Sequence, residues 1–148
     1  MIAYFDTSAL IPLLVDEPGS QRASRLWDVA DNVVAVRLIY AEARAALAQA
    51  TRLGRLSARD LATTLDALEG LYANLDLLEV DEILVRRAGE LAQRHGLRGY
   101  DAVHLAAADR LRDDTAVMVA GDRDLCTAAR TLGMAVADTT AEDAAGWP

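Results

Sequence analysis

Short apolar runs alternate with longer amphipathic stretches along the chain. The runs cover residues 2–5, 33–36, 77–80, 116–120 and 134–137. Runs that are apolar at consecutive positions are typical of strands buried on both faces, as in a parallel sheet. The pattern therefore predicts about five short parallel strands with helices covering both sides of the sheet.

The stretches between these runs carry helix signals. Ser57 and Asp60 have the spacing of a capping box, and Gly54 and Gly96 are suited to end the helices before them. Asp6 to Ser8 is expected to turn the first strand into a helix. The other expected helices cover residues 20–30, 38–53, 57–72, 81–95, 99–111 and 123–132. Strands and helices in alternation indicate an α/β fold, a three-layer α/β/α sandwich.

The bulk composition favours a single domain over residues 1–148. The chain has 148 residues and is 53% hydrophobic, enough for one sizeable core. Its one cysteine, Cys126, has no intramolecular disulfide partner. The N-terminus lacks the features of a signal peptide, and no apolar stretch is long enough to span a membrane. We expect a cytoplasmic location.

The charge pattern argues against several classes of protein. The formal net charge is −8, which is unfavourable for nucleic-acid binding unless bound cations reverse the local field. All fifteen basic residues are arginine. Phosphatases of the haloacid dehalogenase type and phosphate-accepting receiver domains use a lysine, and a Walker nucleotide site needs Gly-Lys-Ser/Thr. The sequence therefore excludes these classes.

Carboxylates mark the candidate site. Ligands of open parallel sheets bind beyond the carboxyl ends of the strands, and Asp6 and Asp122 follow two predicted strands directly. Asp101 lies at the start of an alanine-rich helix. Glu42 has apolar residues three and four positions away, where a carboxylate is costly without a partner.

Each acid also has a structural interpretation. Asp6 and Asp101 are suited to cap helices, and Glu42 would lie at the edge of the apolar stripe if it paired with Arg44. One of Asp122 and Asp124 is expected to cap the next helix. We favour Asp122 for the site because it comes first after the strand, but the choice remains open.

The set of acids is more informative than any member. A parallel fold brings them to one edge, where like charges repel unless a cation lies between them. Oxygen ligands suit Mg²⁺ or Mn²⁺ and argue against zinc. The sequence therefore predicts a magnesium or manganese site.

In their order along the chain, these motifs resemble a PIN domain, and within that group a VapC-type toxin of bacterial toxin–antitoxin pairs. The resemblance runs from Ile2 to about Ala137. It is carried by the segments Asp6-Thr7-Ser8-Ala9-Leu10, Glu42 in its helix, Gly99-Tyr100-Asp101-Ala102-Val103-His104-Leu105-Ala106 and Gly121-Asp122-Arg123-Asp124-Leu125.

The resemblance implies a Mg²⁺- or Mn²⁺-dependent endoribonuclease that forms a homodimer and leaves 5′-phosphate and 3′-hydroxyl ends. It also implies a small antitoxin protein whose terminal segment covers the acidic cleft. Carried over residue by residue, the catalytic acids are Asp6, Glu42, Asp101 and Asp122.

Within this set, Asp6, Asp101 and Asp122 are expected to hold metal, and Glu42 to orient or deprotonate the attacking water. Ser8 and Asp124 are possible supporting residues. Arg98 and Arg123 flank the acids and are candidates for phosphate contacts, with solvated surface arginines as the alternative.

Two further predictions concern His104 and a rival to the nuclease function. His104 is expected to pack or hydrogen-bond along its own helix, because one other histidine is too few for a histidine metal cluster. The rival to the nuclease is a catalytically silent PIN-like module that binds a partner protein or RNA.

Overall fold

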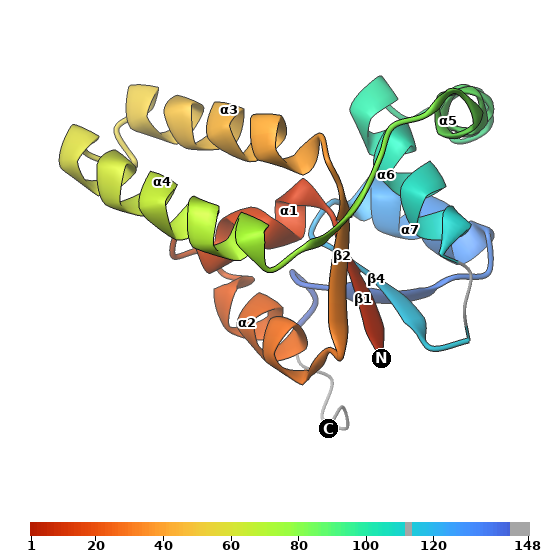
Figure 1. The fold of residues 1–148 in the computed structure, drawn as a ribbon, viewed down its shortest axis with the longest axis horizontal. Helices are drawn as coiled ribbons and strands as arrows, with labels where there is room; N and C mark the ends of the chain where they lie inside the picture. Colours follow the sequence, from red (N-terminus) through yellow and green to blue (C-terminus); the bar gives the residue numbers. More distant parts are fainter. Residues whose placement is uncertain (112–113, 143–148) are drawn as a thin grey trace.

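A parallel sheet runs through the middle of the protein (Figure 1). The computed structural model describes residues 1–111 and 114–142. Within these residues the sheet has five strands in the order β3-β2-β1-β4-β5. The strands are β1 (Ile2–Phe5), β2 (Asn32–Val36), β3 (Asp76–Leu78), β4 (Ala116–Ala120) and β5 (Ala135–Asp138).

The first strand lies at the centre of the sheet. Ile2 of β1 is in register with Asn32 of β2 on one side and with Ala116 of β4 on the other, and both pairs are parallel. Side chains alternate along the strand: Phe5 packs into the core on one face of the sheet, and Tyr4 into the core on the opposite face. Both faces are buried, which explains why the strand sequences are apolar at consecutive positions.

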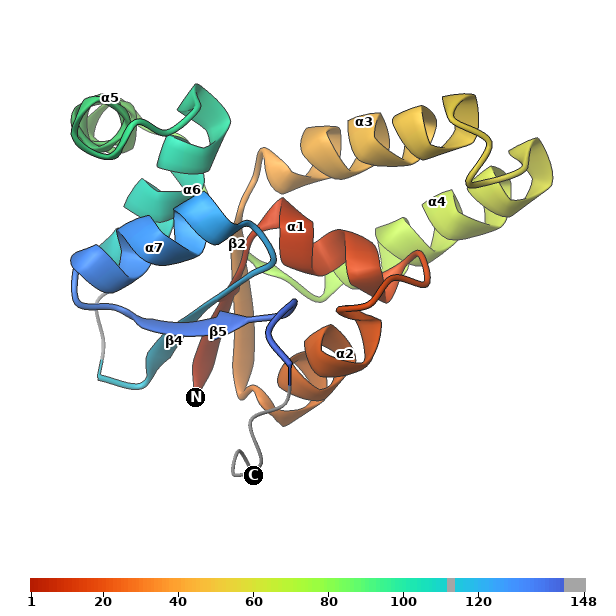
Figure 2. The same cartoon turned by 180° about the vertical axis from the view of Figure 1, so that it is seen from behind.

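Helices cover the two faces in separate groups (Figures 1 and 2). One group packs around Phe5 and the other around Tyr4. The Phe5 side holds α1 (Thr7–Leu10), a 3₁₀-helix (Ile11–Leu13), α2 (Ser20–Val29), α3 (Ile39–Arg52) and α4 (Ala58–Ala73). The Tyr4 side holds α5 (Glu82–His95), α6 (Gly99–Arg110) and α7 (Arg123–Thr131). The predicted α/β/α sandwich around a parallel sheet is confirmed.

Capping residues in the structure explain several of the predicted helix boundaries. The Ser57 side chain accepts a hydrogen bond from the Asp60 backbone N at 3.0 Å, which opens α4. Gly96 follows α5 with φ of 64°, and Gly54 follows α3 with φ of 76°. These positive φ values suit glycine, because other L-residues meet steric strain there.

The other predicted boundaries agree with the structure to within one residue, but two local features do not follow the predictions. The third strand was predicted at residues 77–80 but covers Asp76–Leu78. The strand ends early because β3 is an edge strand and Leu78 is in register with Val36, the last residue of its neighbour β2. The 3₁₀-helix Ile11–Leu13 was not predicted, since its one turn with a proline is too short for helical periodicity to show.

No helix of the described residues has both the length and the apolar character to cross a bilayer. Of the domain predicted over residues 1–148, residues 112–113 and 143–148 lie outside the described part.

Candidate functional site

The acidic residues gather where the strand order changes direction. The chain after β1 continues to β2 on one side of it, and β4 lies on the other side. The carboxyl ends of β1 and β4 lead to Asp6 and Asp122, which are the N-caps of α1 and α7. Glu42 and Asp101 occupy the first turns of α3 and α6. All four carboxylates therefore lie at helix starts, whose partial positive charge favours their ionised form.

Asp6 is held in place by its neighbour in α1. Its Oδ2 accepts hydrogen bonds from the Ser8 backbone N at 3.0 Å and from the Ser8 hydroxyl at 2.5 Å. The same hydroxyl accepts a bond from the Gly121 backbone N at 2.8 Å. Ser8 thus connects the end of β1 to the end of β4. Asp6 serves as a helix cap and also contributes a buried carboxylate, since it is 3% exposed.

Gly121 brings the two strand ends unusually close. A Cβ at this position would lie 2.8 Å from the Thr139 hydroxyl and 3.2 Å from the Ser8 carbonyl oxygen. Real Cβ contacts are essentially never below 3.0 Å. The absence of a side chain at residue 121 is therefore what lets Asp122 follow β4 into the acidic edge.

Glu42 is bonded to a histidine from the opposite layer. Its Oε1 accepts a bond from His104 Nε2 at 2.6 Å, and its side chain is 22% exposed. The buried stripe of α3 runs through Ile39 and Ala43, so Glu42 lies at the edge of that stripe and not in its middle. Arg44, the alternative partner, donates to the Tyr40 hydroxyl at 3.0 Å.

His104 is the residue whose role the sequence did not predict. It is fully buried, and its partners come from β1, α1 and α3 rather than from its own helix. Nδ1 lies 2.9 Å from the Tyr4 hydroxyl and 3.4 Å from Asp6 Oδ1, and Nε2 lies 3.3 Å from the Thr7 hydroxyl. Its position three residues after Asp101, on the buried side of an alanine-rich helix, was the available signal.

Mutual charge effects connect the site. Burial by itself would lower the pKa of His104, but the negative charge of Asp6 and the bond and charge of Glu42 outweigh it and raise the pKa. Burial raises the pKa of Asp101, against the opposing hydrogen bond from Arg98, and the charges of Asp6 and Asp122 add to the rise. Asp6 and Asp122 are thus close enough to Asp101 to affect its protonation.

Asp101 is paired with one of the predicted phosphate-binding arginines. Arg98 Nε donates to Asp101 Oδ2 at 2.8 Å, and the side chains are 82% and 16% exposed. The bond to Asp101 raises the pKa of Arg98, and the charges of Asp122 and Asp6 add to this. Arg98 therefore lies on the solvent side of the acidic edge, and Arg123 is exposed at the start of α7.

The geometry separates the two acids that follow β4. Asp122 is half-buried and caps α7, with Oδ1 accepting from the Leu125 backbone N at 2.9 Å. Its charge contributes to the raised pKa of Asp101. Asp124 is exposed in the first turn of α7. Asp122 therefore both caps α7 and belongs to the acidic edge. The sequence had predicted that one of the two acids would cap the helix and the other would be free for the site.

The oxygen donors fit a hard cation in their chemistry. Across residues 1–111 and 114–142, no group of three or more His, Cys, Asp or Glu side chains is already arranged as metal ligands. Asp6, Glu42 and Asp101 are instead held by Ser8, His104 and Arg98. Because the charges of Asp6 and Asp122 add to the raised pKa of Asp101, a divalent cation among these three would relieve their repulsion.

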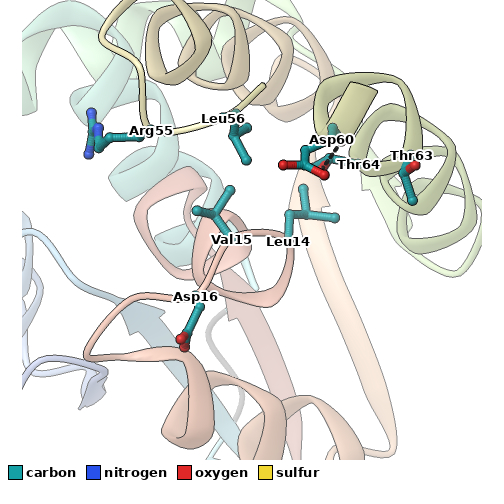
Figure 3. A pocket seen from close by; sticks show the side chains of 8 residues that line it. All are labelled: Leu14, Val15, Asp16, Arg55, Leu56, Asp60, Thr63 and Thr64. Atoms are coloured by element: carbon teal, nitrogen blue, oxygen red, sulfur yellow. Dashed lines mark hydrogen bonds between the residues drawn. The ribbon is translucent and has the colours of Figure 1, made fainter. Parts of the chain in front are cut away.

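A pocket of about 370 Å³ lies elsewhere, between the segment after the 3₁₀-helix and the turn joining α3 to α4. Figure 3 shows Leu14, Val15 and Leu56 turned toward one another at its centre, with Asp16 and Arg55 pointing outward. None of the four candidate acids lines this pocket. The candidate site is therefore identified by its charges and not by the shape of a cavity.

Comparison with known proteins gives concordant matches. The PIN domain family model matches residues 3–131. Ribonuclease VapC45 of Mycobacterium tuberculosis is 43% identical over 136 residues, which is 92% of this chain and 94% of the relative.

Solved structures match the fold. Mycobacterium tuberculosis VapC20, a sarcin–ricin loop cleaving toxin, superposes with a TM-score of 0.65 at 21% identity, covering 85% of this chain and 94% of that one. A toxin–antitoxin complex from Klebsiella pneumoniae gives a TM-score of 0.58 at 20% identity, covering 82% and 88%.

Proposed function

This chain belongs to the PIN domain family, in its VapC group, and from that premise we propose that it is a metal-dependent endoribonuclease, the toxin of a toxin–antitoxin pair. The observation that carries the proposal is the convergence of acids from four helix starts. Asp101 has its pKa raised by burial and by the charges of Asp6 and Asp122, which come from separate elements. Such accumulated negative charge is typical of sites that bind divalent cations.

The proposed reaction is hydrolysis of an RNA phosphodiester. Water adds to the phosphorus, the bond to the 3′ oxygen breaks, and that oxygen takes up a proton from solvent, so the products carry 5′-phosphate and 3′-hydroxyl ends. Glu42 orients the attacking water and accepts its proton through a carboxylate that His104 holds by one oxygen. Asp6, Asp101 and Asp122 would hold Mg²⁺ or Mn²⁺.

When bound, such a cation lowers the pKa of water and stabilises the charge that develops on the phosphate. Arg98 bonds to Oδ2 of Asp101, so Oδ1 can bind a cation while this pair is kept. Arg98 is 82% exposed, so its guanidinium can turn to a phosphate oxygen at little cost. We therefore assign Arg98 and Arg123 to contacts with the RNA backbone and Ser8 to the support of Asp6.

Two protein partners belong to the proposal. The toxin–antitoxin complex among the structural neighbours supports an antitoxin that covers the acidic edge and blocks RNA. A second copy of the chain is expected as well. Ile83 and Val85, which are 76% and 47% exposed at the start of α5, offer apolar surface for a homodimer contact.

The test is cleavage of labelled total RNA by the purified chain, free of partners, with Mg²⁺, with Mn²⁺ and with a chelator. Asp101→Asn and Glu42→Gln run beside Asp66→Asn, which makes the same change at an exposed position on α4. We expect discrete cleavage that needs the metal, is lost in the first two variants and is kept in the third.

Each outcome has a defined meaning. Cleavage that survives both substitutions at the acidic edge would place the activity elsewhere or in a contaminant. No cleavage by the folded, metal-supplied wild type across several RNA pools would favour the catalytically silent module that binds a partner protein or RNA.

A further inference from the structure

We propose that His104 is a positioning residue, which holds Glu42 in the orientation needed for catalysis. The His104 ring is itself fixed by its hydrogen bond with Tyr4. The inference rests on the proposed nuclease function. It deepens that function, because it adds to the acids a residue that acts through one of them.

The bond geometry defines the direction of the interaction. A carboxylate only accepts hydrogen bonds, so His104 Nε2 donates to Glu42 Oε1 across 2.6 Å. At the other side of the ring the Tyr4 hydroxyl lies 2.9 Å from Nδ1, and a hydroxyl can donate to a bare ring nitrogen or accept from a protonated one. The ring is therefore bonded at both nitrogens, to a strand on one side and to α3 on the other.

The burial of His104, Tyr4 and Glu42 supports the positioning role. His104 is fully buried and Tyr4 is 1% exposed, so the surrounding core fixes the ring. The Glu42 side chain is 22% exposed and has several rotatable bonds, so without a partner it would sample many rotamers. A fixed donor beneath a mobile carboxylate selects one orientation and leaves the second carboxylate oxygen for the water.

Two substitutions separate the two ends of the ring. The amide nitrogen of glutamine reaches about as far as Nε2 of histidine, so His104→Gln keeps a donor toward Glu42. The amide of asparagine reaches only about as far as Nδ1, so His104→Asn keeps a partner for Tyr4 and loses the one for Glu42. Each variant removes one hydrogen bond and fills less volume than the ring.

The experiment measures kcat and KM for RNA cleavage with saturating Mg²⁺, the thermal unfolding midpoint, and the ¹H–¹⁵N resonance of the His104 ring. We expect His104→Asn to lower kcat about 10- to 100-fold with little change in KM. His104→Gln should retain most of the wild-type kcat. In the wild type without metal or RNA, the Nε2–H proton should be visible and slow to exchange, and Glu42→Ala should make it exchange fast.

The outcomes distinguish the inference from the proposed function. Equal kcat values for the two variants at different stabilities would show a merely structural histidine and overturn the inference. So would an Nε2–H proton that is indifferent to Glu42→Ala. If the wild type cleaves no RNA, the proposed function fails first and the positioning role fails with it.

Discussion

Among single residues, Asp122 combines two tasks in one carboxylate, as Asp6 does. Its Oδ1 caps α7 at the Leu125 backbone N, and its charge acts on Asp101 at the acidic edge. Asparagine caps a helix about as well as aspartate but carries no charge. A substitution at this position can therefore remove the charge and leave the cap.

We expect Asp122→Asn to abolish metal-dependent RNA cleavage while the unfolding midpoint stays near that of the wild type. Asp124→Asn should leave cleavage intact, because Asp124 is exposed and its charge is not among those that raise the pKa of Asp101. Cleavage rates and thermal unfolding of both variants check this. Loss of cleavage in Asp124→Asn alone would reverse the assignment of the fourth acid.

The candidate acids were predictable because each lies where the topology brings distant segments together. Asp6 and Asp122 follow strands whose positions are evident from hydrophobicity. The partners of these acids were not predictable in the same way. His104 meets Glu42 across 62 positions of sequence and Tyr4 across 100, and helical or strand periodicity carries no information over such separations.

Among elements, the junction of β4 and α7 depends on the absence of one methyl group. We expect Gly121→Ala to lower the free energy of unfolding by about 1–3 kcal/mol, because the new Cβ would meet Thr139 and Ser8. Gly70→Ala is the control: it lies in α4 with nothing within 4 Å of an added Cβ. Denaturant unfolding of the two variants tests the contrast, and equal stabilities would contradict the close approach.

The start of α5 should respond to acid. The Arg110 hydrogen bonds and the Leu84 backbone N lower the pKa of Asp81 to about 2. Because this lies below the value near 3.9 of an unfolded aspartate, the native state binds fewer protons. The stabilisation is therefore complete above about pH 4 and is lost as the pH falls toward 2.

Asp81→Ser isolates this effect, since serine keeps a cap and removes the charge. We expect the wild type to have a higher unfolding midpoint than the variant near neutral pH, with the difference shrinking between about pH 4 and pH 2. Thermal unfolding at a series of pH values measures it. A difference that stays constant through this range would show that the Arg110 pair does not stabilise the fold.

The strands were predictable as elements because a buried parallel strand is apolar throughout, as β1 and β4 are. The exact end of β3 was not. Asp76–Leu78 is only three residues long, and it ends where its only neighbour β2 ends, at Val36. An end that is set by a partner strand distant in sequence leaves no periodic signal in the strand itself.

At the scale of the whole molecule, a divalent cation that binds only the folded chain stabilises it, and the net charge of −8 favours cation binding. A ligand that binds only the folded state at 100 times its Kd contributes about 2.7 kcal/mol. For a chain of this size that corresponds to a rise of about 5–10 °C in unfolding midpoint. We expect Mn²⁺ to raise the midpoint of the wild type and to raise that of Asp6→Asn much less. A rise that Asp6→Asn leaves undiminished would place the cation elsewhere.

The central position of β1 has a consequence for the timing of synthesis. A ribosome releases Ile2–Phe5 first, yet one neighbour of this strand is β4, which begins at Ala116. A nascent chain that ends before that residue carries Asp6, Glu42 and Asp101 but lacks both β4 and Asp122. The acidic edge, and any cleavage that depends on all four acids, is therefore completed only when most of the chain has emerged from the ribosome.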